Sequence, residues 1–218
     1  MSKQQTKSKQ RVADHGEVFT AEREVNAMLD LVKQETERIE SRFLEPACGD
    51  GNFLVEILRR KLAVVKSKYG KKADDYERYA VIAITSIYGI DILPDNVKEC
   101  HKRMYKIFNS EYTANCKEKA NDETRKAVRY ILRHNIICGN TLKMKKRNRT
   151  PIEFIEWSEA KKPGFFKRRY FQLKHLIEAN TKNNYEGYGE GLFGNTDSEV
   201  CESKPASPPI HYRRLGNE

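Results

Sequence analysis

F-L-E-P-A-C-G-D-G-N-F-L, residues Phe43 to Leu54, is the segment from which the fold of this 218-residue chain can be worked out. Residues 42–47 read as a short strand that ends at Pro46, and the residues that follow form a tight turn rich in glycine. Apolar residues then recur every three or four positions, which predicts a helix over about 52–69. A strand that enters a helix through glycines lets a ligand approach the backbone and the free N–H groups of the helix N-terminus.

The remainder of the chain repeats this alternation. After a helix at about 21–40, we expect further strands at 87–92 and 135–138, and helices over 74–86, 94–108 and 121–133. This order predicts an α/β fold in which a parallel sheet carries helices on both faces. Ligands of such sheets bind at the carboxyl ends of the strands. The pattern weakens from Lys143, where 151–157 reads as a strand and 170–179 as a short helix, so we expect the sheet to be incomplete.

The spacing of the glycine turn disfavours a nicotinamide or flavin dinucleotide. A dinucleotide fingerprint needs a third glycine three residues after the second, where this chain has Leu54. It also needs an acid about 20 residues further on. The candidate acid, Asp91, lies 40 residues beyond Gly51, after an additional helix.

At this turn the chain resembles the S-adenosylmethionine-dependent, adenine-specific DNA methyltransferases of restriction–modification systems. Their first motif, Asp/Glu-Pro-Ala-Cys-Gly-x-Gly-x-Phe-Leu, is matched by Glu45 to Leu54 at every fixed position. The resemblance covers about residues 16–142 and implies a Rossmann-like class I methyltransferase sheet with S-adenosylmethionine as the cofactor. The cofactor loop that it implies consists of Glu45, Pro46, Ala47, Cys48, Gly49, Asp50, Gly51 and Asn52.

A second segment, Gly16 to Thr20, resembles the stretch of these enzymes that precedes the first strand and closes over the methionine part of the cofactor. The resemblance places Phe19 and Thr20 at that end of the site. The family commonly continues with proline, where this chain has Ala21.

Two further segments resemble the strand ends of the family. In Tyr88 to Ile92, the resemblance implies that Asp91 accepts hydrogen bonds from the two ribose hydroxyls and that Ile92 packs on the adenine. In Cys138 to Leu142, it places Asn140 at the adenine amino group, where the family usually has an aspartate. The amide oxygen of asparagine can still accept a hydrogen bond.

The residues that position the target base cannot be identified. Adenine-specific enzymes carry Asn/Asp-Pro-Pro-Tyr/Phe after the fourth strand, so that polar groups accept from the target amino group and a ring stacks on the extruded base. The only Pro-Pro here is in Ser207-Pro-Pro-Ile210, which we interpret as a tail turn or a short extended docking segment. Two explanations stay open: a partner subunit supplies the missing target-base motif, or the chain is a truncated or degenerate methylase.

Charge divides the chain into segments. The net charge is +10, yet residues 12–138 carry 22 cations against 21 acids, and residues 139–175 carry 11 against 3. Because Lys and Arg contacts to phosphate dominate nucleic-acid affinity, we expect DNA as a partner and the DNA-binding residues to be Lys167, Arg168 and Arg169. We expect a disordered basic arm over 1–15, a cofactor domain over 16–142, a basic segment over 143–179 and a partly disordered polar tail over 180–218.

Other classes of protein are disfavoured by composition. No stretch approaches the roughly 18 apolar residues of a membrane helix, so no membrane partner is expected. The five cysteines are odd in number and lack a Cys-x-x-Cys pair, which favours a cytoplasmic protein without a metal site. The preferred interpretation is a DNA methyltransferase. The alternatives are a non-catalytic cofactor- or DNA-binding subunit of a restriction or phage complex, and a methyltransferase that acts on RNA or protein.

Overall fold

The computed structural model describes residues 8–15, 17–183 and 203–217. A first sheet holds β1 (Phe43–Glu45), β2 (Ile87–Asp91), β3 (Ile136–Asn140) and β4 (Lys145–Lys146), and a second holds β5 (Glu153–Glu159), β6 (Phe165–Gln172) and β7 (Lys204–His211). The helices are α1 (Lys9–His15), α2 (Glu22–Asp30), α3 (Lys33–Thr36), α4 (Asn52–Tyr69), α5 (Ala73–Thr85), α6 (Pro94–Cys116), α7 (Asp122–Asn135) and α8 (Leu173–Asn183), with 3-10 helices η1 (Lys117–Lys119) and η2 (Tyr212–Asn217).

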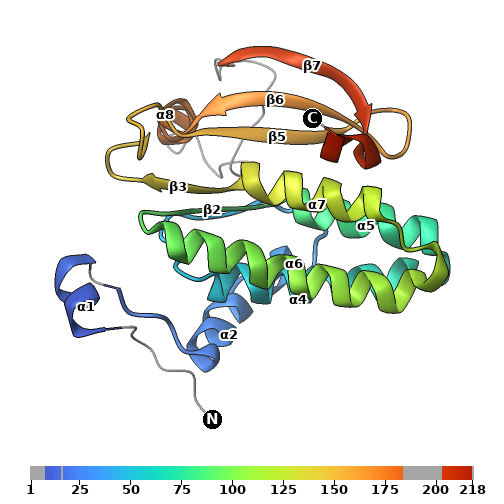
Figure 1. Cartoon of the computed structure of the whole chain (residues 1–218), viewed down its shortest axis with the longest axis horizontal. Helices are drawn as coiled ribbons and strands as arrows, with labels where there is room; N and C mark the ends of the chain where they lie inside the picture. The colour runs from blue at the N-terminus through green and yellow to red at the C-terminus, as the bar shows by residue number, and fades with distance from the viewer. Residues whose placement is uncertain (1–7, 16, 184–202, 218) are drawn as a thin grey trace.

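The predicted parallel pairing is present in the first sheet. β2 lies between β1 and β3 and runs parallel to both, with Gly89 opposite Glu45 on one side and Ile136 on the other. All five residues of β2 are buried, whereas the three of β1 are half-buried, because β1 has a described neighbour on one side only. Helices α5 and α7 run almost directly into β2 and β3 (Figure 1). The carboxyl ends of the three strands therefore share one edge.

The expectation of helices on both faces of the first sheet is wrong. Helices α4 and α6 lie on one face, and β5 of the second sheet packs on the other through Tyr88 (Figure 1). Tyr88 of β2 points to the second sheet, since its hydroxyl donates to the carbonyl of Ile155 at 3.0 Å and its ring meets Phe154 edge-on at 5.4 Å. Trp157 completes the contact, with its indole N–H 2.8 Å from the amide oxygen of Asn135. Large aromatic side chains of β5 thus take the place of a helical layer.

The C-terminal part departs most from its prediction. Tyr170 lies in β6 rather than at the start of a helix, and α8 begins at Leu173. The tail contains β7, in which Ser207 lies opposite Arg168 of β6, so Ser207-Pro-Pro-Ile210 is a strand and not a turn. Prolines are tolerated there because β7 is an edge strand, where a missing N–H costs no ladder bond. Residues 184–202 of the predicted tail lie outside the described residues.

The N-terminal region also differs. Residues 1–7 of the predicted disordered arm lie outside the described residues, but α1 spans Lys9–His15, so the prediction of disorder is wrong for that part. The single helix expected over 21–40 is divided into α2 and α3. The division falls at Val32, whose backbone angles of −119° and 32° lie outside the helical region.

A buried lysine fixes the amino end of β1. Lys61 of α4 is fully buried, and its ammonium donates to the carbonyls of Ile39 and Ser41 and to the hydroxyl of Ser86, at 3.0 Å and 2.7 Å for the first and last of these. Desolvation lowers the pKa of Lys61 from 10.5 to about 7. The side chain therefore joins α4 to the segment that precedes β1 and to the residue that precedes β2.

This lysine predicts a pH dependence of stability. Because the folded pKa lies below the unfolded one, folding releases a proton between about pH 7 and pH 10, and stability rises with pH by up to about 1.4 kcal/mol per unit. We expect urea-unfolding midpoints of the wild type to rise from pH 7 to pH 9 relative to those of Lys61→Met. Lys68→Met, an exposed change on the same helix, should follow the wild type. Parallel pH curves for wild type and Lys61→Met would contradict the assignment.

Candidate cofactor site

The glycine turn joins β1 to α4 at the carboxyl edge of the first sheet. The N–H of Cys48 donates to the carbonyl of Ile90 at 2.8 Å, and the N–H of Gly51 donates to the carbonyl of Cys48 at 2.8 Å, which closes the turn. Gly49 and Gly51 have φ angles of 54° and 90°, which glycine adopts without strain. Gly51 is the N-cap of α4 and, as a glycine, offers no side-chain cap to the first turn. The positive end of an 18-residue helix therefore faces the turn.

Asp91 lies at the end of β2, beside this turn. One of its carboxylate oxygens accepts from the N–H of Gly49 at 2.9 Å, and the other accepts from the N–H of Leu93 at 2.8 Å and the amide of Asn96 at 3.3 Å. The carboxylate is 9% exposed. Since a carboxylate offers about four lone-pair positions, these three bonds leave capacity for about one more donor. Two ribose hydroxyls would need one of the present bonds to be exchanged.

Phe19 and Thr20 lie against the turn. Phe19 is 7% exposed, and a Cβ placed on Gly49 would be 3.2 Å from its ring, so the ring covers the backbone of the turn. The side-chain amide of Asn52 donates to the carbonyl of Thr20 at 2.9 Å. The segment before the first strand therefore packs on the turn and on the start of α4, next to the position of Asp91.

Residues that the sequence did not single out connect the N-terminus to the same place. The guanidinium of Arg11 binds the carboxylate of Glu17 at 2.5 Å and that of Asp95 at 2.9 Å. Glu17 in turn accepts from the amide of Asn96 at 2.6 Å, and Asn96 also contacts Asp91. Glu17 and Asp95 raise the pKa of Arg11. Arg11 thus fastens α1 to the N-terminus of α6. Of Arg11, Glu17 and Asp95, only Glu17 lies within a segment that the sequence singled out, Gly16 to Thr20.

Arg103 of α6 holds Asp50 and Asn52 of the turn in place. Arg103 of α6 donates to the carbonyl of Asp50 at 2.7 Å and to the side-chain oxygen of Asn52 at 2.9 Å, and it forms an ion pair with the Asp50 carboxylate at 2.8 Å. Asp50 is 3% exposed. Arg103, which the sequence did not indicate, therefore fixes two of the predicted cofactor residues from behind the turn.

The opposite wall is formed by the ends of β2 and β3. Ile92 follows Asp91 and leaves 48% of its surface exposed, as an apolar side chain that stacks on a base would. Asn140 ends β3, but its side-chain oxygen accepts from the N–H of Lys143 at 2.9 Å and so closes the turn that follows. Leu142, in that turn, is 94% exposed. Asn140 therefore has a structural partner within its own turn, and its place at the adenine amino group stays a prediction.

The first residues of the loop are tied to their surroundings. A carboxylate oxygen of Glu45 accepts from the N–H of Ala47 at 3.2 Å, and burial raises the pKa of Glu45. Thr141 donates its hydroxyl to the carbonyl of Pro46 at 2.6 Å, which joins the carboxyl ends of β1 and β3. Contact with Cys100 and burial raise the pKa of the Cys48 thiol. Cys48 is therefore a buried packing group in the turn.

Gly51 predicts a strong effect of a single methyl group. A Cβ at this position would lie 2.5 Å from the sulfur of Cys100, and φ is 90°. We expect Gly51→Ala to lower the free energy of unfolding by about 2–4 kcal/mol, from the positive φ and the overlap together. Thermal unfolding checks this, with Cys100→Ala alone as the reference variant, because Cys100 is the residue that the added Cβ would meet. Adding Cys100→Ala should restore part of the loss; no restoration would contradict the proposed overlap.

The three predicted DNA-binding residues occupy different environments in β6. Lys167 is exposed, but Arg168 is 7% exposed, and Arg169 bonds to the carboxylate of Glu156 at 2.5 Å. Glu156 also pairs with Arg42, which precedes β1, at 2.7 Å. Arg169 and Arg42 therefore join the two sheets through Glu156, and the accessible positive surface of Arg168 and Arg169 is small. The basic run in the sequence was a correct signal of charge but not of exposure.

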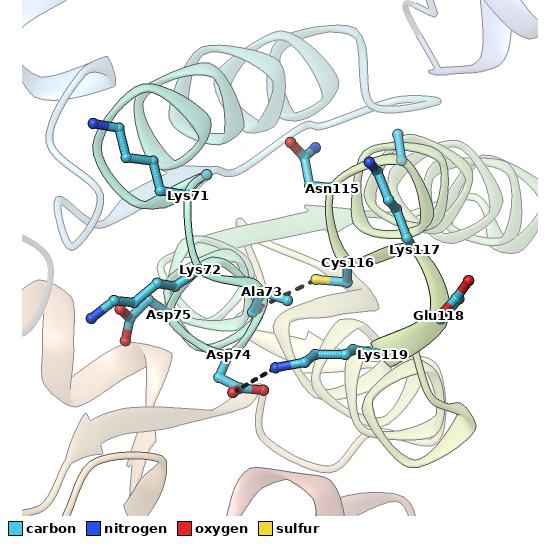
Figure 2. A pocket seen from close by; sticks show the side chains of 12 residues that line it. Lys71, Lys72, Ala73, Asp74, Asp75, Asn115, Cys116, Lys117, Glu118 and Lys119 are labelled. Atoms are coloured by element: carbon cyan, nitrogen blue, oxygen red, sulfur yellow. Dashed lines mark hydrogen bonds and ion pairs between the residues drawn. The ribbon is translucent and has the colours of Figure 1, made fainter.

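Other places in the described residues are poorer candidates for a cofactor site. A hollow of about 890 Å³ lies where α4 and α6 end, and Figure 2 shows its mixed charges, including the contact of Lys119 with Asp74 at 3.4 Å. It is at the far end of both helices from the glycine turn. Within the described ranges, no group of three His, Cys, Asp or Glu could hold a metal ion. In the same ranges, no helix is long and apolar enough to cross a membrane.

The residues described above form an α/β domain with a candidate ligand site at the carboxyl edge of its parallel strands. Residues 6–166 match the family model described as MmeI, DNA-methyltransferase domain, so the chain belongs to this family. The match assigns it to the DNA methyltransferases of restriction–modification systems in general. No curated protein and no solved structure matches the chain.

Proposed function

We propose that this chain is the S-adenosylmethionine-binding part of an adenine-specific DNA methyltransferase, and that a partner subunit supplies the groups that position the target base. The observation that carries the proposal is the bond of the Asp91 carboxylate to the N–H of Gly49. This bond holds Asp91, at the end of β2, against the glycine turn that follows β1. Groups that could bind the ribose and groups that could bind the amino-acid part of one ligand are therefore adjacent.

The residues present fit this cofactor chemically. The N-terminus of α4, whose N-cap is a glycine, suits a carboxylate; Asp91 suits a ribose hydroxyl, and the exposed Ile92 suits an adenine ring. When bound, S-adenosylmethionine supplies an electrophilic methyl group on sulfur. The role of this chain is then to orient it: Phe19 excludes water from the turn, and the fixed turn provides the proximity from which most of the acceleration derives.

The partner subunit is proposed because the sequence lacks the motif by which these enzymes position the target base. The sequence lacks Asn/Asp-Pro-Pro-Tyr/Phe, and Ser207-Pro-Pro-Ile210 belongs to β7 in the second sheet, where the hydroxyl of Ser207 contacts that of Tyr170 at 3.1 Å. That strand belongs to the second sheet, whereas the candidate cofactor site lies at the carboxyl edge of the first. The proposal therefore assigns the target-base groups to a partner subunit.

The test is a pair of measurements on purified protein. Calorimetry should detect binding of S-adenosylmethionine, and labelled methyl should pass to duplex DNA when the product of the neighbouring gene is added. A duplex with N6-methyladenine at every adenine should accept no label. Absence of cofactor binding would refute the proposal. Binding without transfer in any combination would favour the non-catalytic subunit, and label on RNA or protein would favour another substrate.

A further inference from the structure

Cations of the predicted basic segment and of two preceding helices gather on one face of the molecule. They come from α6, α7 and β4, and each of these elements contacts β3 of the first sheet. We call this the basic face; it consists of Lys102, Lys106, Arg129, Arg133 and Lys146. Four of the five are exposed, and Lys146 is half-buried.

Two adjoining hollows make the basic face continuous. A groove of about 700 Å³ along α6 is lined by Lys102, Tyr105 and Lys106 among others. Arg129 of α7 joins it, because its guanidinium lies 4.1 Å over the ring of Tyr105 and donates to the Tyr105 hydroxyl at 2.6 Å. One turn further along α7, Arg133 lines the second hollow.

The second hollow is a pocket of about 620 Å³ between α6, α7, β3 and the second sheet. Arg133, Lys146 and Lys204 reach it from three different elements, so positive charge converges there. Its walls also carry the rings of Tyr130 and His134, whose centroids are 4.2 Å apart. Burial lowers the pKa of His134, which is therefore neutral at pH 7 and can present an uncharged ring. Such a volume suits one sugar-phosphate unit.

Opposing acids are few at this place. Glu99 approaches Lys102 at 3.8 Å, and Glu153 pairs with Lys204 at 2.9 Å, so Lys204 contributes little net charge. Arg129, Arg133 and Lys146 have no ion pair among those found in the described residues. Three cations whose charge is not offset by a described ion pair thus lie on α7 and β4.

We infer that the basic face binds the phosphate backbone of duplex DNA, with one phosphate held at the pocket between Arg133 and Lys146. This inference rests on the proposed function for its partner, because a DNA methyltransferase must hold DNA beside its cofactor domain. It replaces Lys167, Arg168 and Arg169 as the principal contact. Cations on neighbouring elements contact successive phosphates, and such contacts carry affinity without reading sequence.

The test is fluorescence anisotropy with a 30-base-pair duplex over a series of KCl concentrations. The variant is Arg129→Gln, Arg133→Gln, Lys146→Gln in the whole chain. We expect its affinity at low salt to fall at least roughly ten-fold, and the slope of log K against log salt to flatten by about 2 to 3, since each lost phosphate contact removes about 0.9. The matched control is Lys33→Gln, Lys68→Gln, Lys71→Gln, which makes the same change of net charge on α3, α4 and the turn that follows α4.

The outcomes separate this inference from the proposed function. An unchanged slope in the first variant, or an equal loss in both variants, would overturn the basic face, even if cofactor binding and methyl transfer persist. A wild type that binds S-adenosylmethionine but no DNA would overturn it too. Equal affinity for duplex RNA would overturn the assignment to DNA. Loss of DNA affinity in the first variant alone supports it, whether or not the wild type binds the cofactor.

Discussion

Replacing Glu77 with alanine is expected to lower the free energy of unfolding by about 3–5 kcal/mol. The change removes a buried carboxylate and leaves the groups that donate hydrogen bonds to it without an acceptor. Glu77 lies on α5, and its side chain is 2% exposed. Its carboxylate accepts from the hydroxyls of Tyr112 and Tyr212, from the guanidinium of Arg213 at 2.6 and 2.7 Å, and from the amide of Asn121 at 3.0 Å. One carboxylate thus fastens the C-terminal η2 to α5, α6 and the start of α7.

Urea unfolding measures this loss. Glu111→Ala is the matched control, because Glu111 is on α6 with a 42% exposed side chain and a long ion pair to Lys66 at 4.0 Å, and surface pairs contribute about 0–1 kcal/mol. Tyr212→Phe should give an intermediate loss of about 1–2 kcal/mol, from one hydrogen bond to a charged group. If Glu77→Ala unfolds within 1 kcal/mol of the control, the network does not stabilise the fold.

The contact of η2 with α7 explains why this network is sensitive. A Cβ on Gly216 would lie 2.4 Å from the Cβ of Lys126, so the backbone of η2 rests directly on α7. Leu215, beside it, is fully buried. The C-terminal segment therefore completes the core between the second sheet and the helices, and Glu77 supplies its polar anchor. Loosening it should also expose β7, which pairs with β6 alone.

The sequence predicted what depends on neighbours in the chain. The β1 strand, its turn and the helix from Asn52 to Tyr69 were predicted within a few residues, because glycine, apolar period and helix length are local signals. The F-F-K-R-R-Y-F-Q run of β6 was not, since its charged middle hides the alternation. Arg168 is buried there by pairing between β5 and β7, which lie far apart in sequence. No local pattern reveals such a position.

The same limit applies to the site. The glycine turn and Asp91 lie side by side, because the ends of adjacent parallel strands meet at one edge, and their role in binding the cofactor stays a prediction. Arg11 escaped prediction, since it contacts Asp95 across 84 residues of chain and sits in a polar run that resembles a disordered arm. The basic face was missed for a related reason. Its cations come from two helices and a hairpin, and each of these alone looks like an ordinary solvated surface.

Replacing Asp91 with alanine is expected to weaken S-adenosylmethionine binding by roughly 10- to 100-fold, the range for a hydrogen bond to a charged group. Asp91 also holds Gly49, so a lower affinity alone would not distinguish contact with the ligand from a displaced turn. The distinguishing measurement is calorimetry with S-adenosylhomocysteine and with its 2′,3′-dideoxy ribose analogue. In the wild type the dideoxy compound should bind about ten-fold more weakly or worse, whereas in Asp91→Ala the two should bind alike, because the partner of the hydroxyls is gone.

The matched control for this cycle is Asp95→Ala. Asp95 lies four residues on, is 53% exposed and holds Arg11 rather than the turn, so its variant should keep the wild-type preference for the ribose hydroxyls. Because Asp91 has capacity for about one further donor, a single hydroxyl should account for most of that preference, and the 2′-deoxy and 3′-deoxy analogues identify which one. An equal preference in wild type and Asp91→Ala would remove Asp91 from the ribose site, and the carboxylate would then serve only to join the glycine turn to α6.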